Sequence, residues 1–254
     1  MRLTIIGCSG SFPGPESPAS SYLLEAEGFR LLLDLGNGAL GVLQRHADLY
    51  SIDAVALSHL HADHCLDMCS YWVARRFAPG GPQPAIPVYG PAGAAERLSL
   101  AADPGSDLTG AFDFHTLTPG TRRIGPFQVI TERMNHPVET YGFRFEHGGR
   151  VLAYSADTGP GQALVGLARR ADLLLCEATF LDGPGLPPGL HLTGRQAGEH
   201  AARAGARHLV LTHLAPGSDK QRSFAEAESV FPGPISLAAP GQEFDLAPTG
   251  ALPL

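Results

Sequence analysis

The chain contains little lysine and no long apolar run. Lysine occurs once, at Lys220, the arginines are scattered, and the formal net charge is −7. Proteins that bind long nucleic acids usually present a basic face, so this composition argues against a large polyanionic partner and allows a small one. The sequence also lacks an uninterrupted apolar stretch of about 18 residues, so we expect no membrane span.

The N-terminal segment lacks the features of a secretory signal. Residues 1–7 predict a strand and a turn, without a charged segment followed by an apolar segment and a cleavage site. We therefore expect a cytoplasmic protein. The four cysteines form no C-x-x-C pair, and the cytoplasm keeps thiols reduced. We expect Cys65 and Cys69, four residues apart on a predicted helix, to be small buried residues, and a redox role is the alternative.

Length and composition are those of a globular protein. The chain has 254 residues, of which 44% are hydrophobic and 17% charged, which is enough to bury a sizeable core. The Pro/Gly-rich segments 77–87 and 181–189 are more simply loops over a site than domain boundaries. We therefore expect a single domain over residues 1–254.

Short apolar strands alternate with helical segments and are separated by Gly/Pro turns. Gly148-Gly149 predicts a hairpin, and Thr193 is the expected N-cap of a helix. The last two strands are expected to form a final pair. Strands are predicted at 3–7, 21–25, 30–35, 55–58, 86–89, 127–134, 141–146, 150–155, 173–176, 208–212, 235–238 and 243–246, and helices at 37–46, 65–77, 92–102, 160–170 and 194–204.

The segment S-H-L-H-A-D-H, residues 58–64, follows an apolar stretch and places three histidines and a carboxylate close together. Imidazole and carboxylate are the ligands of borderline cations such as zinc and manganese. Two cations that share a water molecule lower its pKa, so that a hydroxide forms at neutral pH. They also bind the attacking and the leaving oxygen of an in-line displacement. A structural zinc site favours cysteine ligands, and this segment has none before Cys65. The spacing therefore indicates a metallohydrolase.

Other ligand-type residues follow other predicted strands. His136, Asp157 and His213 each stand at or just beyond the carboxyl end of an apolar segment. Each of them alone is weak evidence for a metal site. The carboxyl ends of such strands lie along one edge of a sheet sandwich. We therefore expect these residues and the histidine run to form one metal-binding site along that edge.

At these residues the chain resembles the metallo-β-lactamase superfamily, and the histidine run matches the main motif of that superfamily. The turn D-L-G-N-G at 34–38 resembles the D-x-G-x-G of the ribonuclease Z-like branch. C-E-A-T-F at 176–180, followed by H-L-T at 191–193, resembles its E-A-T-F…H-x-T element. The resemblance covers nearly the whole chain. It implies the α/β class and an αββα fold, in which two mixed β-sheets are flanked by helices and a dinuclear site lies on one edge.

The resemblance also implies a role for each candidate residue. It implies two divalent metal ions, with zinc expected and manganese or iron also compatible, and a homodimer. The implied first-metal ligands are His59, His61 and His136, the second-metal ligands are Asp63, His64 and His213, the bridge is Asp157, and the catalytic groups are Asp63, Glu177 and His191. Asp63 would orient the nucleophile, and His191, oriented by Glu177, would protonate the leaving group.

Two departures from the tRNA-processing members point to a small substrate. Those bacterial members carry a long tRNA-gripping arm between the ligands that correspond to His136 and Asp157, where this chain has only a predicted hairpin. After His213 the chain reads L-A-P-G, without the S-R-Y-like continuation. The segments 3–11, 17–22 and 64–67 also resemble actinobacterial proteins associated with cyclic nucleotide phosphodiesterase activity. We therefore expect a dinuclear metal-dependent phosphodiesterase of a small substrate, namely a 3′,5′-cyclic nucleotide.

Three alternatives stay open. The first is a tRNA 3′-processing endonuclease of the ribonuclease Z type, and the second is a phosphodiesterase of other small esters, such as cyclic ribose phosphates. The third is a non-catalytic metal-binding or redox sensor protein, against which the complete ligand set argues. Trp72 or Phe77 could stack a base, and packing in a helix core is the alternative for Trp72.

Overall fold

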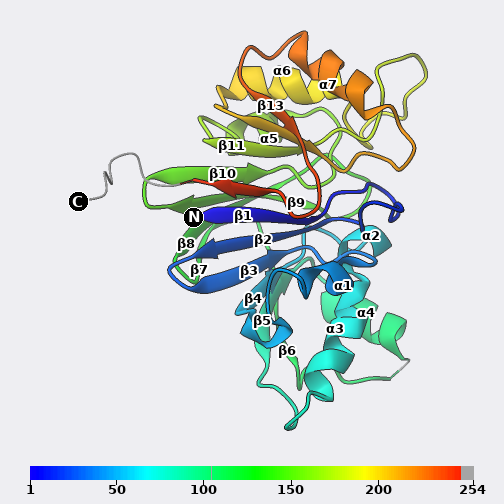
Figure 1. Cartoon of the computed structure of the whole chain (residues 1–254), viewed down its shortest axis with the longest axis vertical. Coiled ribbons are helices and arrows are strands. Elements are labelled where there is room, and N and C mark those ends of the chain that lie inside the picture. Colours follow the sequence, from blue (N-terminus) through cyan, green and yellow to red (C-terminus); the bar gives the residue numbers. More distant parts are fainter. Residues whose placement is uncertain (104, 247–254) are drawn as a thin grey trace.

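Two β-sheets stack face to face, and helices cover both outer faces of the stack (Figure 1). The computed structural model describes residues 1–103 and 105–246. The single domain expected from the sequence extends to residue 254, and its positions 104 and 247–254 lie outside the described residues. The expected αββα arrangement of two mixed sheets is confirmed.

The first sheet holds the N-terminal strands and one strand from the other end of the described chain. In spatial order it contains β14 (Glu243–Asp245), β1 (Arg2–Gly7), β2 (Ser21–Ala26), β3 (Phe29–Leu33), β4 (Ala54–Ala56), β5 (Ile86–Gly90) and β6 (Phe112–Thr116). Neighbours from β14 to β3 are antiparallel, and neighbours from β3 to β6 are parallel. The carboxyl end of β4, which precedes the histidine run, therefore lies inside a parallel part of this sheet.

The second sheet is built in the same way from the later strands. In spatial order it contains β13 (Ile235–Leu237), β12 (Leu209–Thr212), β11 (Leu173–Glu177), β10 (Arg150–Tyr154), β9 (Tyr141–His147), β8 (Phe127–Arg133) and β7 (Gly120–Ile124). Neighbours from β13 to β10 are parallel, and neighbours from β10 to β7 are antiparallel. The carboxyl ends of β10, β11 and β12 thus share one edge.

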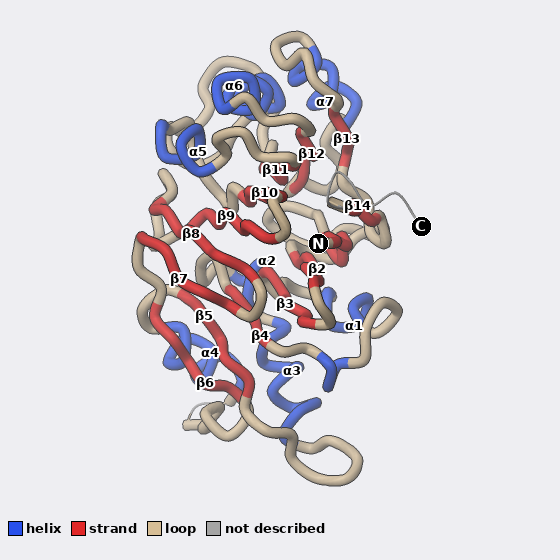
Figure 2. Tube along the Cα trace, turned by 90° about the vertical axis from the view of Figure 1, so that its left-hand side faces the viewer, coloured by secondary structure: helices blue, strands red, loops and turns tan. Residues whose placement is uncertain are grey.

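Helices from each half of the chain cover the sheet of their own half (Figure 2). The first sheet is covered by α1 (Ala39–Leu43), α2 (Ala62–Cys65), α3 (Asp67–Arg76) and α4 (Ala94–Ala102), and the second by α5 (Gln162–Leu167), α6 (Gly194–Ala204) and α7 (Lys220–Glu228). A short 3₁₀ helix spans Leu49–Ser51. Within the described ranges, no helix combines the length and the apolar character needed to cross a bilayer.

Three apolar clusters separate these layers, one between the sheets and one between each sheet and its helices. On β9, Tyr141, Phe143 and Phe145 alternate toward the central cluster, as expected for a strand with one buried face. On β11, all five residues are buried because a parallel strand in this position is covered on both faces. Burial of these continuous and alternating apolar segments holds the sandwich together.

The structure corrects the sequence-based prediction in several places. The last two strands do not pair with each other: β13 joins β12 and β14 joins β1, in different sheets. Residues 62–76 form two helices, α2 and α3, instead of one helix over 65–77. The strands β6 and β7 and the helix α7 were not predicted, because polar and exposed residues interrupt the apolar period in each. The predicted Gly148-Gly149 hairpin is present between β9 and β10.

One glycine shapes the segment that carries the histidine run. A Cβ atom added at Gly36 would lie 1.9 Å from the backbone oxygen of Asp63. Only glycine therefore lets the 34–38 turn pack against the first turn of α2.

We predict that Gly36→Ala destabilises the metal-free protein by roughly 1–3 kcal/mol, because backbone must move to admit the methyl group. Gly41→Ala in α1 is the matched control, since its added Cβ meets no atom within 4 Å. Urea unfolding of both variants measures the difference. Equal free energies of unfolding for the two variants would contradict this packing argument.

Candidate metal centre

The candidate ligands converge at one edge of the sandwich. Four of them follow the carboxyl ends of strands: His59 follows β4, His136 follows β8, Asp157 follows β10 and His213 follows β12. The remaining three lie in the loop and helix after β4. His61 is the N-cap residue of α2, and Asp63 and His64 are inside that helix. Strands from both sheets therefore contribute to one cluster, as the sequence analysis anticipated.

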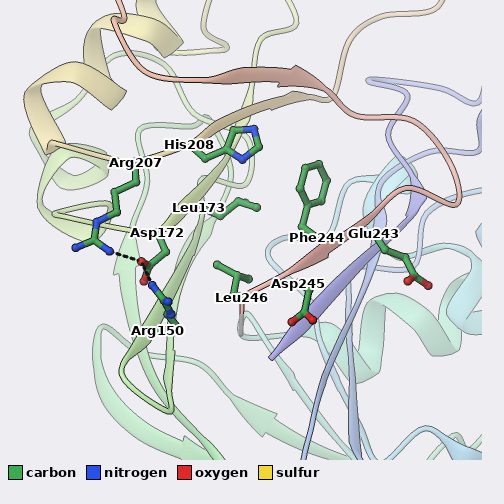
Figure 3. Close-up of a pocket in the computed structure, with 9 residues that line it drawn as sticks. All are labelled: Arg150, Asp172, Leu173, Arg207, His208, Glu243, Phe244, Asp245 and Leu246. Atoms are coloured by element: carbon green, nitrogen blue, oxygen red, sulfur yellow. Dashed lines mark hydrogen bonds and ion pairs between the residues drawn. The ribbon is translucent and has the colours of Figure 1, made fainter. Parts of the chain in front are cut away.

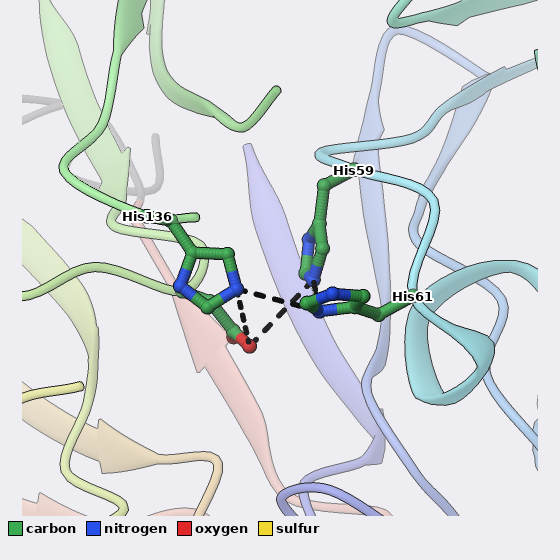
Figure 4. Close-up of side chains that lie close together, drawn as sticks. His59, His61 and His136 are labelled. Carbon is green, nitrogen blue, oxygen red and sulfur yellow. Dashed lines mark hydrogen bonds and ion pairs between the residues drawn. The ribbon is translucent and has the colours of Figure 1, made fainter. Parts of the chain in front are cut away.

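One group of ligand atoms comes from His59, His61, His136 and Asp157, whose atoms all lie within 4.8 Å of one another. Nε2 of His59 is 3.0 Å from Nδ1 of His61, which in turn is 3.3 Å from Nε2 of His136. Figure 4 shows the three imidazole rings pointing toward a common centre from separate segments. Oδ2 of Asp157 is 3.6 Å from Nε2 of His59. This group offers three nitrogens and one carboxylate oxygen to a cation.

A second, fully buried group comes from Asp63, His64, Asp157 and His213. Nε2 of His64 is 3.2 Å from Oδ1 of Asp157 and 3.2 Å from Nε2 of His213. Nε2 of His213 is 3.1 Å from Oδ2 of Asp63. Asp157 belongs to both groups, with Oδ2 toward the first and Oδ1 toward the second, so one carboxylate stands between two potential cation sites.

The chemistry of these donors fits divalent cations. Several imidazole nitrogens face one another at close range, and Oδ1 of Asp157 is buried and accepts no hydrogen bond within the described part of the chain. Burial and the neighbouring His64 hold the pKa of His59 well below its usual value, so this ring is neutral, which is the form that binds a cation. Burial opposes ionisation of Asp157, but His213 and His64 outweigh it and lower the pKa of this carboxyl.

Buried Glu177 and partly buried His191 form a pair beside both groups. Nδ1 of His191 donates to Oε1 of Glu177 at 2.9 Å and is 3.9 Å from Oδ2 of Asp157. The ring of His191 lies 5.5 Å from that of His136 and 5.4 Å from that of His213, centroid to centroid. Burial lowers the pKa of His191, but the hydrogen bond and the charge of Glu177 outweigh this and raise it. The structure thus holds a proton-bearing imidazole against the candidate centre.

Asp34, the first residue of the D-L-G-N-G turn, supports the centre from outside. Its buried carboxylate accepts hydrogen bonds from the backbone N–H and the hydroxyl of Ser58, from Nδ1 of His64 and from the hydroxyl of Tyr154, all at 2.7–2.8 Å. The bond to Nδ1 leaves Nε2 of His64 facing the second group. The position of Asp34 after an apolar strand was a usable signal, whereas the contact with Tyr154 was not visible in the sequence.

Two other sequence-based suggestions do not fit the geometry. Trp72 packs in the cluster between the first sheet and its helices. Phe77 follows the last residue of α3, and the 10 residues of that helix separate it by roughly 15 Å from the start of α3, which is the helix end nearer in sequence to Asp63. Burial raises the pKa of the Cys65 thiol to about 12, which favours its protonated, less reactive form and disfavours a redox role. Cys69 is only partly buried, contrary to the expectation, and burial raises the pKa of its thiol as well.

A pocket of about 420 Å³ lies at the opposite edge, beside the N-terminal ends of β10, β11 and β12 (Figure 3). Its arginines, Arg150 and Arg207, both donate to the carboxylate of Asp172. The pocket is therefore separate from the metal cluster, which gathers at the carboxyl ends of the same strands.

Comparison with known proteins agrees with this geometry. The β-lactamase superfamily domain matches residues 30–214. An uncharacterized protein of Mycobacterium leprae is 44% identical over 97% of this chain and 89% of its own length. Ribonuclease Z of Myxococcus xanthus is 28% identical over 97% of this chain and 98% of its own length. The crystal structure of the metallo-β-lactamase fold protein YhfI from Bacillus subtilis matches with a TM-score of 0.87 and 30% identity, covering 96% of this chain and 98% of that one.

We predict that Asp34→Asn destabilises the metal-free protein by about 3 kcal/mol, because the buried donors around it lose a carboxylate oxygen as acceptor. Asp53→Asn is the control, since Asp53 accepts an exposed bond from the backbone N–H of Arg30, and we expect it to cost about 1 kcal/mol or less. Chemical unfolding measures both. A loss for Asp34→Asn as small as that of the control would show that Asp34 does not organise the centre.

Proposed function

The chain belongs to the β-lactamase superfamily, and from this membership and the geometry of its centre we propose that it is a metal-dependent phosphodiesterase of small substrates. The proposed substrate is a 3′,5′-cyclic nucleotide. The observation that carries the proposal is the pair of ligand groups that share Asp157, with the His191–Glu177 pair against both. Relatives named probable metallo-hydrolase and ribonuclease Z support metal-dependent hydrolysis.

Each ligand group would hold one divalent cation. The first would be held by His59, His61, His136 and Asp157, and the second by Asp63, His64, His213 and Asp157. When bound, two such cations lower the pKa of a shared water and neutralise charge on phosphate oxygens. Zinc is the proposed metal, and manganese and iron suit the same ligands.

Two of the protein's own groups would manage protons during hydrolysis. The charges and hydrogen bond of neighbouring histidines lower the pKa of Asp63 against the effect of its burial, so its carboxylate is ionised and can orient a nucleophilic water. Nδ1 of His191 donates to Glu177, which leaves the opposite ring nitrogen, Nε2, to donate a proton to the departing 3′-oxygen. A leaving alkoxide needs such a donor, because it is a strong base.

The dimensions of the chain support a small substrate. Most of the segment between His136 and Asp157 is occupied by β9, β10 and their tight turn, which leaves too few residues for a long gripping arm. The net charge of −7 and the single lysine also disfavour a long polyanion. A homodimer belongs to the same proposal and rests on the family resemblance. The cytoplasmic location expected from the sequence belongs to it as well.

Ribonuclease Z activity is the second candidate, because a relative of that name aligns over 97% of this chain. We predict that the zinc-loaded protein hydrolyses 3′,5′-cyclic AMP and bis(p-nitrophenyl) phosphate and leaves a tRNA precursor intact. The three substrates are compared at equal protein concentration, with bound metal quantified. Cleavage of the precursor at its 3′ end would replace the small-substrate proposal with the RNA-processing one.

A substitution at His191 tests its role as proton donor. We predict that His191→Ala lowers turnover of 3′,5′-cyclic AMP roughly a hundredfold or more while bound metal stays unchanged. Turnover of bis(p-nitrophenyl) phosphate should fall much less, since p-nitrophenolate leaves without protonation. His115→Ala is the control, because His115 is an exposed histidine on β6 that pairs with Asp113. Its turnover of both substrates should match that of the wild type. Equal losses on the two substrates would exclude the acid role.

A further inference from the structure

Thr179 lies between the second ligand group and the His191–Glu177 pair. It is two residues beyond the end of β11, and its side chain is buried. The backbone around it is fixed on both sides: the N–H of Ala178 donates to the carbonyl of Thr212, and the N–H of Phe180 donates to the carbonyl of Leu192. Its hydroxyl is therefore held in a defined position against the centre.

The Thr179 hydroxyl contacts a candidate metal ligand directly. Its Oγ1 is 2.8 Å from Nδ1 of His213 and 3.0 Å from the backbone oxygen of the same residue. Nε2 of His213 faces Asp63 and Asp157, so this nitrogen must carry the free lone pair when the ring binds a cation. The ring proton then sits on Nδ1 and is donated to Oγ1 of Thr179. The hydroxyl thereby sets both the tautomer and the orientation of His213.

The same hydroxyl contacts the carboxylate that holds the proposed proton donor. Oγ1 of Thr179 is 2.9 Å from Oε2 of Glu177, and Oε1 of Glu177 accepts from Nδ1 of His191. A carboxylate is a stronger acceptor than a backbone carbonyl, so the hydroxyl proton is directed to Glu177. One continuous chain of bonds therefore runs from His213 through Thr179 and Glu177 to His191.

The backbone of His213 gives this contact additional weight. His213 has a φ of 55°, a left-handed conformation that is uncommon for residues other than glycine. The Thr179 hydroxyl contacts both the ring and the backbone of this residue. Loss of the hydroxyl would therefore remove the hydrogen-bond partner of a ligand whose backbone is in an uncommon conformation.

We propose that Thr179 is a positioning residue that couples the second metal group to the His191 proton donor through Glu177. The claim about catalysis in this inference rests on the proposed function. The claim about metal binding concerns the ligand His213, and zinc affinity is measured without any substrate. The coupling predicts that one hydroxyl affects both zinc affinity and leaving-group dependence.

The test compares variants that lack the hydroxyl with one that keeps it. Thr179→Val removes the hydroxyl at nearly constant volume, Thr179→Ala removes it without adding bulk, and Thr179→Ser retains it. Thr131→Val is the matched control, because Thr131 is a buried threonine on β8 whose hydroxyl donates to the backbone oxygen of Thr118. Zinc affinity of the metal-free protein is measured by competition with a chromophoric chelator, and thermal unfolding confirms that each variant is folded.

We predict that Thr179→Val and Thr179→Ala lower the affinity for the more weakly bound of the two zinc ions about tenfold or more. A loss of this size is typical when a metal ligand loses its outer hydrogen-bond partner. Thr179→Ser and Thr131→Val should bind as the wild type does. At saturating zinc, the ratio of 3′,5′-cyclic AMP to bis(p-nitrophenyl) phosphate turnover should fall in the hydroxyl-free variants and be restored in Thr179→Ser.

Unchanged zinc affinity in a folded hydroxyl-free variant would overturn the proposal, as would a loss that serine does not restore. If Thr179→Val fails to fold, Thr179→Ala carries the same comparison. A protein with no phosphodiesterase activity would contradict the proposed function, whereas the zinc measurement would still decide whether Thr179 positions His213. An unchanged substrate ratio with weakened zinc binding would overturn the coupling to His191.

Discussion

The carboxylate of Asp157, buried among imidazoles, is the constraint around which the active edge is organised. Isolated burial of a carboxylate is costly, and here one of its oxygens accepts no hydrogen bond from the described residues. Nitrogens of His59 and His64 approach it from two sides, and they are also close to nitrogens of other histidines. Two cations, one on each side of Asp157, would bind both the carboxylate oxygens and the lone pairs of the neighbouring histidine nitrogens.

The sandwich topology explains why such a cluster can form. The parallel portions of both sheets end at the same edge, so loops after β4, β10 and β12 meet there although they are far apart in sequence. A rigid scaffold of paired strands holds these loops, and residues outside the ligand set, such as Asp34 and Thr179, fix individual ring nitrogens. The position of each nitrogen therefore depends on the fold as a whole.

The sequence predicted most of the residues that cluster at this edge and a large part of the fold, for identifiable reasons. Residues 58–64 are informative because ligand types at short spacing follow an apolar strand, and Asp157 is recognisable because it follows another such strand. The pairing of β13 and β14 was wrong, because strands of three residues carry too little pattern to specify a partner. The role of Thr179 was not predictable, since its contact with His213 joins positions 34 residues apart through packing alone.

The proposed dinuclear centre is tested most directly by anomalous X-ray diffraction from crystals of the protein grown with Zn²⁺. We predict two anomalous peaks, one among His59, His61 and His136 and one among Asp63, His64 and His213. Each peak should lie about 2.0–2.2 Å from an oxygen of Asp157. A single peak, or peaks that do not contact Asp157, would contradict a centre bridged by this carboxylate.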